Sequence, residues 1–333
     1  GYRRRGAHRS ELKIENDLEY DIEFTIISNE DVQNDTEIVK ADDETVIHFE
    51  KNAKYIQVSL KMKDAAAMKI PLKGGEIAFN ASTSKEHRGL AVIADLKGAN
   101  GLLLLKLVSS SALVNDCDVP VDLKSPVSEK DDEPEFWTAT VMPHQTIFLP
   151  LRVAERGALS IRPSVARGAT PTHSYSAAFR CGLGAFREKD LANNVELIDA
   201  GGDALIGPKF VIRCATTAEA DDATALDWHA AFTCEIRQVS PTAGRALTPV
   251  YQFTLRPTFI VENLLPRQIG FRWQCRQTNS VLKELNAMNV GETIGIHETT
   301  SPHSKVLEPE DEPELPFKRR GTDTVTLSVR LPS

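Results

Sequence analysis

The chain has 333 residues, a formal net charge of −8 and an apolar content of 41%. Its length suggests two or three domains or repeats, and its acidic charge argues against non-specific nucleic-acid binding, which needs a basic face. The longest apolar run, Leu102–Leu105, is far shorter than the roughly 20 apolar residues of a membrane-spanning helix.

Alternation between apolar and polar residues predicts short β-strands along the chain. The first clear run lies between Leu18 and Ile26, where every second residue is apolar. Such alternation indicates a strand with one buried and one solvated face. Similar runs follow at 56–60, 159–161, 251–255, 269–273 and 325–331. We therefore predict an all-β fold made of tandem β-sandwich-like repeats.

Two further kinds of segment interrupt this pattern. Residues 187–200 and 218–232 are the places where a short helix is expected. Two acidic, proline-containing stretches, 128–135 and 308–314, are either solvated loops or an acidic docking surface.

An asparagine recurs in the same apolar frame at three places, Asn16, Asn115 and Asn263. In every copy an apolar residue or cysteine stands two residues before the asparagine and two, six and eight residues after it. These residues are Ile14, Leu18, Ile22 and Phe24 in the first copy, Leu113, Cys117, Val121 and Leu123 in the second, and Val261, Leu265, Ile269 and Phe271 in the third.

A second signature follows each asparagine at a nearly constant distance. It reads ETVIHF at 44–49, QTIFLP at 145–150 and ETIGIH at 292–297. The threonines Thr45, Thr146 and Thr293 lie 29, 31 and 30 residues after the asparagine of their copy. Two signatures at a fixed offset predict three copies of one β-repeat.

The repeat boundaries follow from these spacings. We predict a first β-repeat over 1–108, a second over 109–254 with an insertion at about 164–232, and a third over 255–333. Only 70 residues follow Asn263, against 99 from Asn16 to Asn115, so the third repeat is expected to be truncated and the chain to be a fragment.

The asparagines themselves are expected to be structural. A side-chain amide offers two donors and an acceptor, so it can bond the backbone at a bend where strand pairing is interrupted. Asparagine also tolerates a positive φ better than most residues. Its removal would leave buried backbone groups unpaired, at a cost of roughly 1–3 kcal/mol.

Two segments around these signatures resemble a known family. LRPTFIVENLLPRQIGF (255–271) and VMPHQTIFLPLRVAERGALSIRP (141–163) resemble parts of the vacuolar protein sorting thirteen family of bridge-like lipid transfer proteins. In that family a proline-glycine pair precedes the polar residues of the second segment. Here Pro143, Pro150–Leu151 and Arg162–Pro163 fit the pattern, but His144 replaces the glycine.

The resembling region is the family's adaptor-binding (VAB) domain, which has six β-repeats with one characteristic asparagine each. Asn16, Asn115 and Asn263 match that asparagine, and the order of the copies resembles repeats one to three. Residues 164–250 match only loosely. The resemblance implies adaptor partners with a proline-x-proline motif, which bind later repeats, so their site is expected to lie outside this fragment.

The sequence gives only weak signals for catalytic or metal-binding residues. The five cysteines, Cys117, Cys181, Cys214, Cys234 and Cys275, form no CxxC pair, which favours a reduced cytosolic protein over a zinc or redox site. CGLGAFR (181–187) lacks the third glycine of a phosphate-binding loop, and His297 and His303 lack ligand spacing. The tryptophans Trp137, Trp228 and Trp273 are expected in the core or on strands, and Trp137 is the candidate for an exposed binding aromatic.

These observations lead to one preferred function and two alternatives. The preferred one is a non-enzymatic adaptor-binding or scaffold module of a large lipid transfer protein, without catalytic, cofactor-binding or metal-binding residues. It would be cytoplasmic and peripheral at organelle membranes and contact sites, reaching membranes only indirectly through adaptors and the parent protein. The alternatives are a purely structural β-sandwich spacer and an enzyme whose site lies within 164–232.

Overall fold

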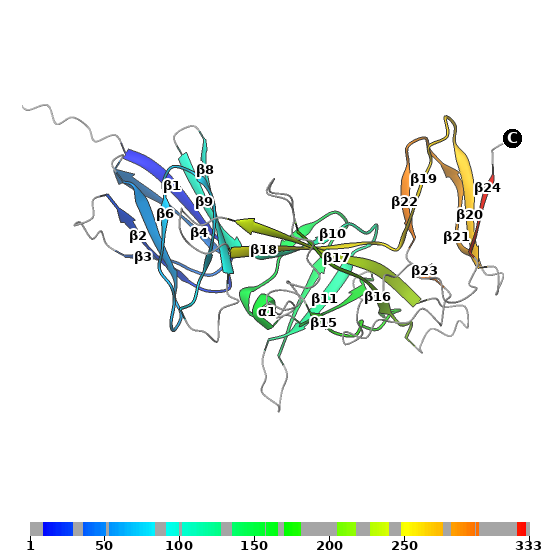
Figure 1. Cartoon of the computed structure of the whole chain (residues 1–333), viewed down its shortest axis with the longest axis horizontal. Coiled ribbons are helices and arrows are strands. Elements are labelled where there is room, and N and C mark those ends of the chain that lie inside the picture. Colours follow the sequence, from blue (N-terminus) through cyan, green and yellow to red (C-terminus); the bar gives the residue numbers. More distant parts are fainter. Residues whose placement is uncertain are drawn as a thin grey trace, which may run out of the picture.

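Nearly all of the regular secondary structure in the described part of the chain is β-strand, and the prediction of an all-β, sandwich-like fold is confirmed. The computed structural model describes residues 9–28, 36–50, 53–83, 91–99, 102–127, 135–156, 158–165, 170–180, 205–217, 227–239, 248–275, 281–296, 298–299 and 325–330. Figure 1 shows three successive groups of strands along the chain, which we call the first, second and third modules.

The first module is a sandwich of two sheets. A five-stranded sheet has the order β4-β1-β9-β8-β7, and a four-stranded sheet has the order β3-β2-β5-β6. The strands are β1 (Arg9–Asn16), β2 (Ile22–Ile27), β3 (Glu37–Val39), β4 (Asp43–Glu50), β5 (Tyr55–Leu60), β6 (Met68–Pro71), β7 (Gly75–Asn80), β8 (Ala91–Ala99) and β9 (Leu102–Ser109).

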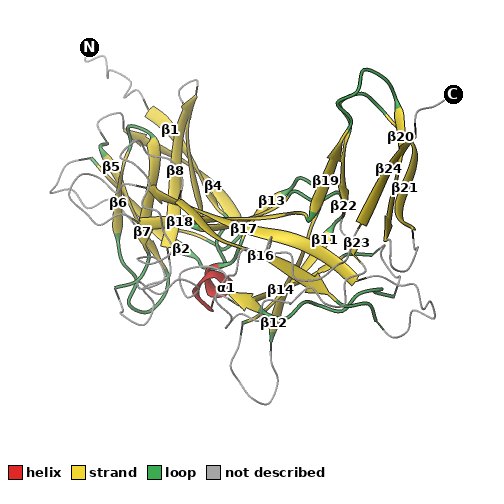
Figure 2. Ribbon diagram, turned by 45° about the vertical axis from the view of Figure 1, so that its right-hand side comes forward, coloured by secondary structure: helices red, strands yellow, loops and turns green. Residues whose placement is uncertain are grey.

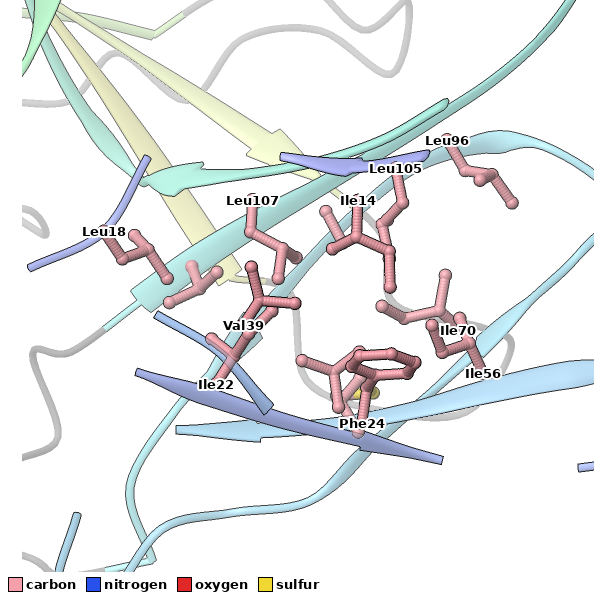
Figure 3. Packing of buried hydrophobic residues seen from close by; sticks show 14 of the residues in the cluster. Ile14, Leu18, Ile22, Phe24, Val39, Ile56, Ile70, Leu96, Leu105 and Leu107 are labelled. Carbon is pink, nitrogen blue, oxygen red and sulfur yellow. The ribbon is translucent and has the colours of Figure 1, made fainter. Parts of the chain in front are cut away.

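Alternate residues of both sheets form the core of the first module. Ile14 and Leu105 from one sheet face Phe24 and Ile56 from the other, and all four are at most 2% exposed (Figure 3). Because neighbouring residues of a strand point to opposite faces, the alternation in the sequence becomes one continuous buried layer.

The second module repeats this arrangement. One sheet has the order β13-β10-β18-β17-β16, and the facing sheet has the order β12-β11-β14-β15. Its elements are β10 (Ser111–Asn115), β11 (Val121–Pro126), β12 (Phe136–Val141), β13 (Thr146–Phe148), α1 (Leu151–Arg156), β14 (Ala158–Pro163), β15 (Phe179–Arg180), β16 (Leu205–Cys214), β17 (Asp227–Val239) and β18 (Thr248–Pro257).

The third module has fewer described strands. β19 pairs with β22, and β20 lies between β21 and β24 in a second sheet. A short strand, β23, pairs with β17 of the second module. The bounds are β19 (Phe259–Glu262), β20 (Ile269–Cys275), β21 (Val281–Met288), β22 (Thr293–Ile296), β23 (Glu298–Thr299) and β24 (Val325–Arg330).

The modules share one pairing scheme around the strand that ends at or just before the asparagine. β1 pairs antiparallel with β4 and in parallel with β9, and β10 pairs antiparallel with β13 and in parallel with β18. β19 pairs antiparallel with β22. The threonine signature falls on β4, β13 and β22, so the two sequence signatures lie side by side on antiparallel strands.

The structure differs from the sequence prediction of helices in two places. Residues 227–232 are not helical, because they begin the long strand β17. Trp228, Ala230, Phe232 and Cys234 are all buried, a period of two that places them on one face of the sheet. The helix α1, which directly follows Pro150, was not predicted. The expected helix at 187–200 lies outside the described residues.

Helix α1 joins the first two modules. Leu151 belongs to the second module by sequence, but its fully buried side chain packs in the core of the first. The carboxylate of Glu19 accepts the N–H groups of Leu151 and Arg152 at 2.9 and 2.8 Å. Figure 2 shows α1 between the strands of these modules.

Candidate functional site

The three predicted asparagines occupy equivalent positions in the three modules. Asn16 and Asn115 are the last residues of β1 and β10, and Asn263 directly follows β19. Their side chains are 0%, 0% and 1% exposed. Each begins the bend that carries the chain from one sheet to the other, so the structure places them at three separate bends.

Each amide bonds its own bend in the same way. The Oδ1 atoms of Asn16, Asn115 and Asn263 accept the N–H of the residue two positions later, at 3.3, 3.1 and 3.0 Å. Each Nδ2 donates at 2.9 Å to the carbonyl oxygen four positions later. These two bonds close the bend from inside the sandwich.

A further bond ties the bend to the opposite sheet. Nδ2 of Asn115 donates to Val141 O at 3.0 Å, and Nδ2 of Asn263 donates to Met288 O at 2.9 Å. In the first module Asn16 bonds Lys40 O at 2.8 Å, next to β3. The amide therefore connects the strand before the bend with the strand that packs across the core.

The threonine signature completes this arrangement through its first residue. Oε1 of Gln145 accepts the N–H of Met142 at 2.9 Å, and Oε2 of Glu292 accepts the N–H of Asn289 at 2.6 Å. Each side chain closes the turn before its own strand. In the first module Glu44 instead forms an ion pair with Lys13 at 2.6 Å.

Positive φ angles occur in these turns and not at the asparagines. His144 has φ of 59° and Gly291 has φ of 74°, and both donate their N–H to the carbonyl of the marker asparagine of their module. His144 therefore adopts the left-handed conformation that glycine adopts most readily. The tolerance of asparagine for positive φ is not used at Asn16, Asn115 or Asn263.

The described cysteines have the character of core residues. Cys117, Cys214 and Cys234 are buried. Burial raises the pKa of the Cys117 and Cys214 thiols to about 12, and the neighbouring acids Asp118 and Asp116 act in the same direction on Cys117. A thiol with such a pKa carries almost no thiolate near pH 7 and is a poor nucleophile.

Within the described ranges, no group of three or more histidines, cysteines and acids is placed to hold a metal ion. A depression is lined by Arg162 and by residues of the expected insertion, among them Pro171, His173 and Tyr175, and it is wide open to solvent. The loop CGLGAFR and the residues His297 and His303 lie outside the described residues.

The exposure of the aromatic side chains near the first acidic stretch differs from expectation. Trp137 packs partly buried against the core of the second module, in phase with the buried Val141. The exposed aromatic is its neighbour Phe136, at 43%, with Nζ of Lys124 lying 3.9 Å from the ring centroid. The alternation of β12 could have indicated this, since Phe136 is in phase with the exposed Thr138. Trp228 is buried as expected.

No helix in the described residues is long and apolar enough to cross a bilayer.

A comparison with curated proteins gives no match. Residues 73–312 match the family model for the adaptor binding domain of vacuolar-sorting associated protein 13. This match spans more than two thirds of the chain and includes Asn115 and Asn263, and it confirms the resemblance found in the sequence. The chain therefore belongs to the vacuolar-sorting associated protein 13 adaptor-binding domain family.

Proposed function

We propose that the chain is a non-enzymatic adaptor-binding and scaffold module that helps to target a large lipid transfer protein to organelle membranes and contact sites. The family match over residues 73–312 is the observation that carries this proposal. The partners are adaptor proteins with proline-x-proline motifs, and the membrane is reached through them. The module is cytoplasmic and peripheral.

The asparagine bends support a role as a rigid binding platform. Each one joins two sheets through several buried hydrogen bonds to the backbone, and buried, fully bonded polar groups fix one arrangement of a core. Such a module presents its surface loops and strand edges to a partner with little reorganisation, which lowers the entropic cost of binding.

The first experiment deletes residues 1–333 from the parent protein and follows its localisation. The proposal expects loss of organelle targeting while expression is maintained. Unchanged targeting would contradict it and would favour the second candidate, a structural spacer. That candidate is favoured by the contacts of Glu19 with α1, because they fix neighbouring modules in tandem without a partner.

A pull-down locates the adaptor site relative to the chain. An immobilised proline-x-proline peptide is incubated with the 333-residue chain, and the same peptide with both prolines replaced by alanine is the control. Selective capture by the proline peptide places an adaptor site within these residues. If both peptides capture the chain equally, the adaptor site is assigned to later repeats, as the family resemblance implies.

A further inference from the structure

The open depression on the second module has the size and lining of a site for a small anionic ligand. Its volume is about 610 Å³, within the range of small-molecule sites. Arg162 of β14 lines it together with residues of the expected insertion, which are Thr170, Pro171, His173, Ser174, Tyr175 and Thr217. Among the described residues, its lining includes a guanidinium group and several hydroxyl groups but no carboxylate.

Backbone hydrogen bonds hold the wall of the depression in place. The N–H of Ser176 donates to the carbonyl of Ile161 on β14 at 2.8 Å, and the N–H of Ser174 donates to the carbonyl of Ala215, just after β16, at 2.8 Å. Tyr175 lies between these two anchored residues. Its ring is therefore positioned by the fold before any ligand arrives, which lowers the entropic cost of binding.

Arg162 is fixed from behind while its forked end stays unused. Its Nε donates to Oδ2 of Asp122 at 3.2 Å, and Oδ1 of Asp122 accepts the hydroxyl of Thr140 at 2.8 Å. Its guanidinium carbon lies 4.4 Å from the ring centroid of Tyr175. No described residue offers an acceptor to its two Nη groups. Arg213, by contrast, directs both Nε and Nη2 at its partner carboxylate.

Tyr175 and Lys124 add a hydroxyl donor and a second positive charge. Burial raises the pKa of Tyr175, so its hydroxyl stays protonated and can donate, and within the described ranges it has no acceptor. Nζ of Lys124 lies 5.5 Å from the same ring centroid and 3.9 Å from that of Phe136. No carboxylate of a described residue pairs with Lys124. Two cations therefore flank the ring of Tyr175, and Asp122 balances only one of them.

We propose that this depression binds a phosphate monoester, whose oxygens accept hydrogen bonds from the Nη groups of Arg162 and the hydroxyl of Tyr175. The phosphate offers three strong acceptor oxygens and close to two negative charges near pH 7, whereas a carboxylate offers two oxygens and one charge. The ligand is a free phosphate ester or the phosphate headgroup of a lipid. The inference does not depend on the proposed adaptor function, and it gives the insertion in the second module a role of its own.

Two pairs of ligands test the proposal with the 333-residue chain. Calorimetry compares glycerol 3-phosphate with glycerate, and sedimentation compares phosphatidylcholine vesicles that contain phosphatidic acid or, at equal surface charge, phosphatidylserine. In the pair that matches the ligand's source, the phosphate monoester is expected to bind roughly tenfold more tightly. A preference in the soluble pair identifies a free ester, and a preference in the vesicle pair alone identifies a lipid headgroup.

The same experiment can overturn the proposal in two ways. Absence of a preference in both pairs would show that the depression does not recognise a phosphate monoester. A phosphoserine peptide is the third probe, with the unphosphorylated peptide as its control. Selective binding of the phosphopeptide without a preference in either small-ligand pair would assign the depression to a protein partner and would overturn the proposed ligand class.

Tyr175→Phe tests the contact at the site itself. The substitution keeps the ring and removes a hydroxyl that bonds no described residue, so the fold should be retained. Affinity for the preferred phosphate ligand is expected to fall roughly tenfold, because a hydrogen bond to a charged group is lost. The matched control is Tyr55→Phe on β5, where the side chain is 40% exposed. Unchanged affinity in Tyr175→Phe would contradict the proposal.

Arg162→Lys separates recognition of the phosphate from stability of the module. Lysine keeps the positive charge but lacks the fork that binds two oxygens at once. The variant is expected to lose most of the preference for the phosphate over the matched control ligand. This ratio of affinities does not change when part of the protein is unfolded, so it reports the site and not the fold. A lower melting temperature with an unaltered ratio would mean that Arg162 has only a structural role.

Discussion

Asp118 of the second module accepts the backbone N–H of Gly295 in the third, with 2.9 Å between Oδ2 and N. Asp118 stands three residues after Asn115, and Glu19, which binds α1, stands three residues after Asn16. The same position in successive modules thus holds a carboxylate that bonds the backbone of the next module. Such charge-assisted bonds are stronger than neutral ones.

The close approach at Gly295 predicts that Gly295→Ala weakens the joint between the second and third modules. A Cβ there would lie 2.4 Å from Cγ of Pro257 and 2.9 Å from Oδ2 of Asp118. We expect a loss of about 1–3 kcal/mol in stability and faster hydrogen exchange in β22. The control is Asp118→Asn, which keeps a side-chain oxygen as acceptor and should have a smaller effect. Unchanged exchange in Gly295→Ala would show that the joint adapts.

Each marker asparagine should stabilise its own module. Asn16→Ala, Asn115→Ala and Asn263→Ala are each expected to lower stability by roughly 1–3 kcal/mol, because buried carbonyl groups lose their donor. The effect should appear as faster hydrogen exchange in the substituted module only. Unaffected exchange in that module would contradict the role given to its asparagine.

The left-handed turns predict that substitutions at the equivalent positions His144 and Gly291 change the melting temperature in opposite directions. His144→Gly should raise the melting temperature, because it removes a left-handed penalty of about 1–2 kcal/mol that the entropy of glycine offsets only in part. Gly291→Ala should lower it, although no atom lies within 4 Å of the added Cβ. A lower melting temperature for His144→Gly would mean that the imidazole contributes more than its backbone costs, for example through Asp116, 3.5 Å away.

His229 predicts a pH dependence of stability. Burial, the larger effect, and the nearby Arg213 lower its pKa from the ordinary value of 6.5. The unfolded chain therefore binds the proton more readily, so the free energy of unfolding should fall as the pH drops below about 6.5, with a slope of at most about 1.4 kcal/mol per pH unit. Urea titrations of His229→Gln should lack this component. His48→Gln, at a site with 54% side-chain exposure, should retain it.

The repeat markers could be predicted because they depend on local spacing. An asparagine, its apolar frame and the threonine signature lie on neighbouring strands. The number of residues between asparagine and threonine therefore stays nearly constant even where other loops differ in length. The strand β17 was missed because its first residues, DWHAAF, follow an alanine-rich stretch that has helical propensity. Pairing with β16 and β18 overrides that propensity.

The contacts between modules could not be predicted from the sequence. Glu19 and Leu151 are separated by 132 positions, and a single glutamate in a polar bend carries no sign of its distant backbone partner. The left-handed conformation of His144 could not be predicted for a similar reason, because the presence of a histidine does not by itself indicate that conformation. Both features depend on tertiary geometry.

The position of Leu151 has a consequence for biosynthesis. The core of the first module contains a side chain encoded some forty residues after its last strand, β9. On a ribosome, this module cannot complete its packing until the helix α1 has left the exit tunnel. Its final folding step is therefore linked to synthesis of the second module, and expression of residues 1–108 alone would leave a leucine-sized void in an otherwise closed core.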